Sequence, residues 1–192
     1  MQQGLPRRDL KHVVYLHGFP SSPASDKAQR FRGECDRRGI SFTCPDLNLP
    51  SSDTATVTRM LDQAREAIEA TGEGPVMLVG SSFGGFLAVH AAARDKTGRV
   101  ARLALMAPAF AFDGHLELAL FKEAAQYDSF NVQLTQPIHI FQGRQDEEVL
   151  PETVAAWSAG RPNVDLHWYD DGHRLAGSVE EILAVSISQF AS

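Results

Sequence analysis

Ser82 is the residue best placed to do chemistry, because it lies at the centre of the segment GSSFG at residues 80–84. A short apolar run precedes this segment, and a run with helical period follows it. A strand, a sharp turn and a helix in that order would expose the central serine as a nucleophile. The residues two before and two after the nucleophile must be small, and Gly80 and Gly84 meet this demand for Ser82 but not for Ser81. The five-residue pattern also arises by chance in glycine-rich loops, so the flanking strand and helix are what favour a catalytic role.

A serine hydroxyl needs a base, and the base needs an acceptor that fixes its tautomer. Two loops supply these groups: Asp146 follows the predicted strand 137–142, and His173 follows the predicted strand 164–169. Parallel strands place their carboxyl ends at one edge of a sheet, so both side chains are expected near Ser82. The sequence therefore predicts a triad in the chain order Ser, Asp, His.

Each of these residues has an alternative. Asp146 could be only a turn or capping acid, with Glu147 or Glu148 in its place, although its position three residues after Gly143 fits a turn at a strand end. The main alternative to His173 as the base is His17, which ends the first predicted strand. A structural hydrogen bond to its own loop is favoured there over base catalysis.

Acyl transfer also requires donors directed at the developing oxyanion. One predicted donor is the N–H of Phe83, at the start of a helix where the helix dipole adds to the effect. The second is the N–H of Phe19 in the loop 17–20, where Gly18 allows the backbone to turn inwards. A plain Gly-Pro turn would also explain this loop, but its position relative to Ser82 favours a functional role.

Short apolar runs alternate with segments of helical period, which is the pattern of repeated βα units. They predict a three-layer α/β fold with about six mostly parallel strands and helices on both faces. The predicted strands are residues 12–17, 40–44, 75–80, 101–107, 137–142 and 164–169. One helix is predicted over 56–70, and the last begins at Ser178, with Glu181 in capping-box spacing. We expect a single domain over residues 1–192, with a small cap inserted at 108–136.

The composition excludes several functions. The 192 residues carry a net charge of −6, which argues against nucleic acid as a partner. Cys35 and Cys44 form no C-x-x-C pair and the histidines form no H-E-x-x-H pair, so no metal, redox group or other cofactor is expected. No stretch has the length of a membrane span, and the first residues lack the apolar core of a signal peptide, so a cytoplasmic location is expected.

The segments 15–28 (YLHGFPSSPASDKA) and 79–86 (VGSSFGGF) resemble those of α/β-hydrolases, most closely the small YqiA-like bacterial esterases. The resemblance spans nearly the whole chain, and its first segment is the most specific part. It implies a serine hydrolase that acts on a small acyl ester or thioester, with Ser82, Asp146 and His173 as its triad. The extra first strands and the long lid of larger α/β-hydrolases are absent, so their substrate preferences cannot be carried over.

The sequence leaves three hypotheses about the function open. The first is a carboxylic ester hydrolase that works through an acyl-enzyme, with short or small acyl groups expected from the short cap. The second is a thioesterase acting on acyl-CoA or a related carrier, which would use the same residues. The third is a non-catalytic binding protein on a hydrolase framework, which has no need for a complete triad. The apolar side chains of the cap could form an acyl pocket, pack on the sheet or contact a second copy in a homo-oligomer.

Overall fold

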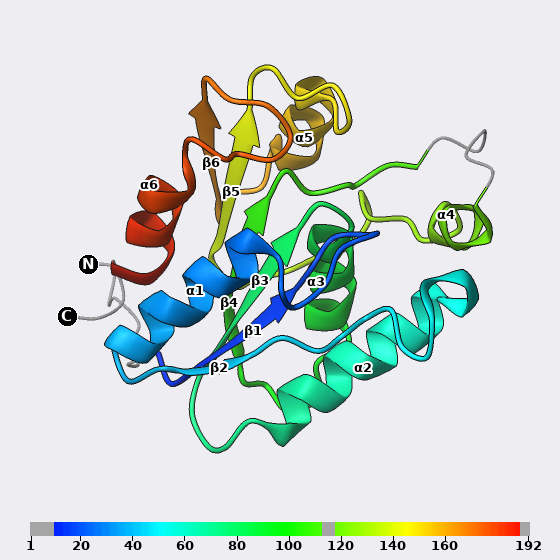
Figure 1. Ribbon diagram of the computed structural model, residues 1–192. Helices are drawn as coiled ribbons and strands as arrows, with labels where there is room; N and C mark the ends of the chain where they lie inside the picture. The colour runs from blue at the N-terminus through cyan, green and yellow to red at the C-terminus, as the bar shows by residue number, and fades with distance from the viewer. Residues whose placement is uncertain (1–9, 113–117, 189–192) are drawn as a thin grey trace.

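Six strands form one sheet in the order β2-β1-β3-β4-β5-β6, and every neighbouring pair is parallel (Figure 1). This computed structural model describes residues 10–112 and 118–188. The strands are β1 His12–Leu16, β2 Ser41–Thr43, β3 Val76–Ser81, β4 Val100–Met106, β5 Ile138–Gly143 and β6 Val164–Tyr169. Each boundary lies within one residue of the predicted one, so the six strand predictions are confirmed.

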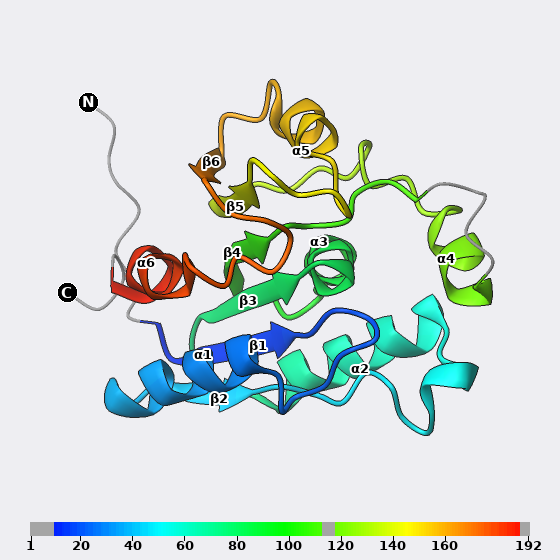
Figure 2. The same cartoon turned by 45° about the horizontal axis from the view of Figure 1, so that its top comes forward.

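Helices cover both faces of the sheet, as Figure 2 shows, and the predicted three-layer architecture is therefore confirmed. The α-helices are α1 Asp26–Arg37, α2 Val57–Ala70, α3 Phe83–Ala93, α4 Ala119–Ala124, α5 Pro151–Ser158 and α6 Val179–Leu183. A 3-10 turn spans Ser52–Thr54, and a π-helical turn, Ala184–Ser188, continues α6. One hydrophobic core joins the sheet to α2, α3, α4 and α5, and a second core joins the opposite face to α1 and α6. No helix within the described ranges combines the length and the hydrophobicity that crossing a bilayer requires.

The helix predicted over 56–70 is α2, and its buried side chains form the predicted apolar stripe. Thr56 caps it, because its hydroxyl accepts a hydrogen bond from the N–H of Arg59 at 3.2 Å. The capping box predicted at Ser178 is wrong. The Ser178 hydroxyl makes no cap for α6 and donates instead to Asp171 Oδ2 at 2.9 Å.

The segment 108–136, where a cap is predicted, contains α4 and the loops on either side of it; residues 113–117 fall outside the described part of the chain. Glu123 of α4 accepts hydrogen bonds from the N–H groups of Val57 and Thr58, at 2.9 and 3.1 Å. A carboxylate at this position satisfies free N–H groups at the start of α2 and complements its dipole. Glu123 therefore ties the segment to α2.

Glycines allow the backbones of β1, β3 and α3 to touch at the carboxyl edge of the sheet. A Cβ atom on Gly80 would overlap the carbonyl oxygen of Gly84, and a Cβ atom on Gly84 would overlap the carbonyl oxygen of Leu16. A Cβ atom on Gly85 would lie only 2.7 Å from Cβ of Pro108. These contacts explain why the turn around Ser82 requires small residues.

We predict that Gly84→Ala disrupts this edge, because the atoms it would meet belong to rigid backbone. The free energy of unfolding should fall by about 3 kcal/mol or more, measured by urea denaturation. Gly33→Ala is the matched control, since a Cβ atom at this exposed position of α1 meets nothing within 4 Å. The control should gain up to about 1 kcal/mol from its better helix propensity. Equal stability of the two variants would contradict the steric argument.

A second prediction concerns His90, which is 3% exposed in α3 and has Nε2 3.0 Å from Ser129 Oγ. Burial, reinforced by Arg94, lowers the pKa of His90 to about 4. The unfolded chain binds this proton near pH 6.5, so between about pH 6.5 and pH 4 it is more protonated than the folded chain. Stability should therefore fall as the pH decreases through this window, by up to about 3 kcal/mol from this residue.

The variant His90→Gln should remove that part of the acid sensitivity, because an amide can still bond Ser129 but does not titrate. Urea denaturation at neutral pH and at about pH 4.5 measures the change in the free energy of unfolding between the two conditions. His12→Gln, which loses a half-buried histidine of β1, is the control. If His90→Gln loses as much stability on acidification as the wild type does, the assignment of this acid sensitivity to His90 is wrong.

Candidate active site

Ser82 occupies a strained turn between β3, which ends at Ser81, and α3, which begins at Phe83. Its φ of 55° and ψ of −118° are rare for a residue with a side chain. Three hydrogen bonds hold it: its N–H donates to the Met106 carbonyl at 2.9 Å, and its carbonyl accepts from Gly85 and Ala109 at 2.8 and 3.2 Å. These backbone hydrogen bonds together stabilise the strained conformation and hold Ser82 at the edge of the sheet.

The structure brings Ser82, Asp146 and His173 together. His173 Nε2 lies 3.0 Å from Ser82 Oγ, and His173 Nδ1 lies 2.9 and 3.0 Å from the two carboxylate oxygens of Asp146. A carboxylate only accepts, so Nδ1 carries the proton and Nε2 is left to accept one from the serine hydroxyl. The arrangement can deprotonate a nucleophile and stabilise the resulting imidazolium.

Asp146 is 3% exposed and is held by several donors. The N–H groups of Glu148 and Val149 donate to Oδ1 at 3.0 and 2.8 Å, and Gln142 Nε2 donates to Oδ2 at 3.0 Å. Burial alone would raise the pKa of Asp146, but the hydrogen bonds from His173 and Val149 outweigh it and hold that pKa below its ordinary value. Asp146 is therefore ionised at neutral pH.

The two glutamates considered as alternatives to Asp146 lie elsewhere. Glu147 is exposed. The Glu148 side chain is 71% exposed, and its Oε2 is 3.7 Å from His173 Nε2, on the serine side of the ring. The carboxylate that contacts Nδ1 is that of Asp146.

His17 has both ring nitrogens engaged. Nδ1 donates to the Gly18 carbonyl at 2.8 Å, and Nε2 accepts from the N–H of Leu47 at 3.0 Å. Burial lowers the pKa of His17, so the ring is neutral. These bonds fix the loop after β1, which is the structural role expected for this histidine.

The loop 17–20 lies directly beside the turn at Ser82. A Cβ atom on Gly18 would be 3.2 Å from the Ser81 carbonyl oxygen and 3.4 Å from Ser82 Cβ. The rings of Phe19 and Phe83 have their centroids 6.4 Å apart. Phe83 is the first residue of α3, so its N–H lies outside the hydrogen-bond ladder of the helix. Both predicted oxyanion residues are therefore close to the serine.

The loop that carries His173 is organised by Asp171, which the sequence reasoning missed. Asp171 Oδ2 accepts hydrogen bonds from the Gly177 N–H at 3.0 Å and from the Ser178 hydroxyl at 2.9 Å. Its backbone carbonyl accepts from the N–H of Gln145, in the Asp146 loop, at 3.0 Å. An aspartate before a glycine was the available signal, since it is typical of a turn that bonds its own backbone.

Two cavities border Ser82. The more polar of the two, of about 630 Å³, also borders His173 and has the charged side chains of Lys27, Arg174 and Glu148 in its wall; it is called the polar cavity below. The other, of about 580 Å³, is mainly apolar and lies under the segment that contains α4. Its aromatic lining residues are Phe19, Phe83, Phe110, Phe112 and Phe121. A substrate bound at Ser82 would thus have the apolar cavity on one side and the polar cavity on the other.

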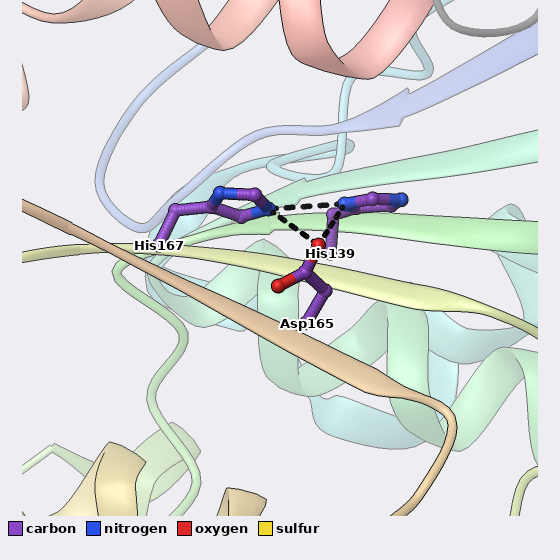
Figure 3. A group of neighbouring side chains, drawn as sticks. All are labelled: His139, Asp165 and His167. Carbon is purple, nitrogen blue, oxygen red and sulfur yellow. Dashed lines mark hydrogen bonds and ion pairs between the residues drawn. The ribbon is translucent and has the colours of Figure 1, made fainter.

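Figure 3 shows His139, Asp165 and His167, a group of possible metal ligands on β5 and β6. His139 Nδ1 lies 3.1 Å from His167 Nε2, and Asp165 Oδ2 lies 3.7 and 3.3 Å from these two nitrogens. Among the residues described, this group could hold a metal ion, although a hydrogen bond between the two rings explains the same contact. The sequence reasoning missed it because the two histidines are 28 positions apart and meet only through strand pairing. It borders neither cavity at Ser82.

The comparisons with known proteins agree with this fold. A family described as "Uncharacterised protein family (UPF0227)" matches residues 12–190. Lipase LipV of Mycobacterium tuberculosis is 37% identical over 79 residues, which cover 39% of this chain and only 30% of the lipase. A Xanthomonas campestris structure described as belonging to the alpha/beta hydrolase superfamily is 27% identical, with a TM-score of 0.69, covering 93% of this chain and 97% of that chain. Alpha/beta hydrolase domain-containing protein 10 from mouse, 20% identical, has a TM-score of 0.79 over 93% of this chain and 88% of its own. The chain belongs to the UPF0227 family and has the fold of the α/β-hydrolase superfamily.

Proposed function

We propose that this protein is a serine hydrolase that cleaves carboxylic esters through an acyl-enzyme on Ser82. The observation that carries the proposal is the unbroken chain of contacts from Ser82 Oγ through His173 to the buried, ionised Asp146. The partial match to a lipase supports ester chemistry. A non-catalytic binding protein would need neither the strained serine nor its aligned base.

In the first half-reaction, Ser82 Oγ attacks the ester carbonyl carbon while His173 Nε2 takes the hydroxyl proton. The carbonyl oxygen becomes an oxyanion that accepts hydrogen bonds from the N–H groups of Phe19 and Phe83. The bond to the leaving oxygen then breaks as His173 returns the proton to it, which leaves an ester on Ser82. Water repeats the same steps to release the acid. An acyl thioester would react in the same way, with sulfur leaving in place of oxygen.

We assign the acyl group to the apolar cavity, with the segment 108–136 serving as a small cap of a single domain. Phe83 and Phe121 pack edge to face in its wall, and Phe112 and Phe121 are stacked, with centroids 5.7 and 5.9 Å apart. The expectation of short acyl groups comes from the short cap, which favours an open site.

The test of the reaction is Ser82→Ala, assayed on a panel of acyl esters and acyl-CoA thioesters. Turnover should fall by roughly a millionfold, because the nucleophile is lost. A fluorophosphonate probe should label the wild type at Ser82 and leave the variant unlabelled. Ser158→Ala, on α5 at a serine that lines neither cavity, should label as the wild type does. Full activity of pure Ser82→Ala protein would contradict the assignment of Ser82 as the nucleophile.

The test of the acyl site is a chain-length series from acetyl to palmitoyl esters. Wild-type kcat/KM should be highest for acetyl or butyryl esters. Phe121→Ala removes a ring from the cavity wall and should shift the preference towards octanoyl esters by about tenfold. Phe130→Ala is the matched control, because this phenylalanine lies in the same segment but is 41% exposed and does not line the cavity. A wild-type optimum at palmitoyl would contradict the short-chain proposal.

A further inference from the structure

We propose that the polar cavity beside Ser82 binds a carboxylate or phosphate group on the leaving-group side of the substrate, with Lys27 as its counter-ion. This inference rests on the proposed function and extends it from esters in general to anionic esters. Lys27 would determine specificity through binding, with no part in proton transfer.

Lys27 lies in the first turn of α1, half-buried, in the wall of the cavity that also borders Ser82 and His173. Its side-chain ammonium forms no ion pair or hydrogen bond with any residue in the described ranges. Burial lowers the pKa of the Lys27 ammonium, and the carboxylates of Asp146 and Asp171 partly offset this effect. A cation that is partly withdrawn from water without a partner is unfavourable, and a ligand anion would relieve that cost.

The other charges on the cavity wall leave the positive ones available. Arg174 is exposed and, like Lys27, has no ion pair or hydrogen bond within the part of the chain described. Asp26 is already bonded to Arg30 at 2.8 Å. Glu148 lies at the boundary of the two cavities, with its side chain turned largely to solvent. The polar cavity therefore offers two unpartnered cations to a ligand.

The position of His173 assigns this cavity to the leaving group. The base that protonates the leaving oxygen must be within hydrogen-bond reach of it. His173 borders the polar cavity and is absent from the described lining of the apolar one. Apart from Glu148, the described lining of the apolar cavity carries no charge. An anion on the leaving group would consequently face Lys27 and Arg174, whereas an anion on the acyl group would meet a largely apolar wall whose one described charge is the Glu148 carboxylate.

The experiment compares three butyryl esters with closely related leaving groups: 4-hydroxybenzoate, its neutral methyl ester, and 4-hydroxyphenyl phosphate. Wild-type KM should be about tenfold lower for the two anionic esters than for the neutral one, as a charged hydrogen bond predicts. Lys27→Met should abolish this difference by raising KM for the anionic esters, with kcat changed by less than about threefold. The two anionic arms show whether carboxylate or phosphate is the preferred group.

Lys96→Met, at an exposed lysine after α3, removes the same charge away from the cavity and should keep the wild-type preference. Equal KM values for charged and neutral esters in the wild type, or an unchanged preference in Lys27→Met, would overturn the anion site while leaving the hydrolase proposal intact. Titration calorimetry with phenyl phosphate tests the site without turnover: Lys27→Met should weaken binding about tenfold, and no binding to the wild type would overturn the inference. Failure to hydrolyse any of the three esters would count against the proposed function instead.

Discussion

The close approach of backbone segments at the carboxyl edge of the sheet is the constraint on which the site depends. Gly84 leaves no room for a Cβ atom beside the Leu16 carbonyl oxygen, so α3 starts in direct contact with the end of β1. This contact forces the chain to reverse within one residue, and Ser82 takes the strained conformation that results. Rigid backbone thus sets the position from which the Ser82 side chain projects.

A buried carboxylate provides the second constraint. Asp146 is 3% exposed, and its ionised form is stable only because backbone N–H groups, Gln142 and His173 all donate to it. The hydrogen bond from His173 that helps to stabilise the ionised Asp146 also fixes the orientation of the His173 ring. Asp171 adds the link between the two loops by accepting from Gln145.

The sequence predicted the features that follow from local pattern. Alternation of apolar runs located the strands, and the parallel-sheet rule placed Asp146 and His173 near Ser82 without any knowledge of distance. It could not predict side-chain hydrogen bonds for which no catalytic pattern exists. The capping box at Ser178 failed because Asp171 takes its hydroxyl, and the cap of α2 by Glu123 comes from a helix more than 60 positions away. The group at His139 depends on strand register in the same way.

The two cavities meet at Ser82 and take much of their remaining lining from opposite faces of the sheet, and this gives the proposed substrate a direction. Phe83, Phe110 and Phe121 belong to the core formed with α2, α3, α4 and α5, whereas α1, which carries Lys27, packs on the other core. Ser82, at the turn between β3 and α3, is where these two faces meet. An ester must then enter with its acyl part over one face and its leaving group over the other. Because Lys27 belongs to α1 and Phe121 to α4, the two halves of the proposed specificity depend on side chains from different helices.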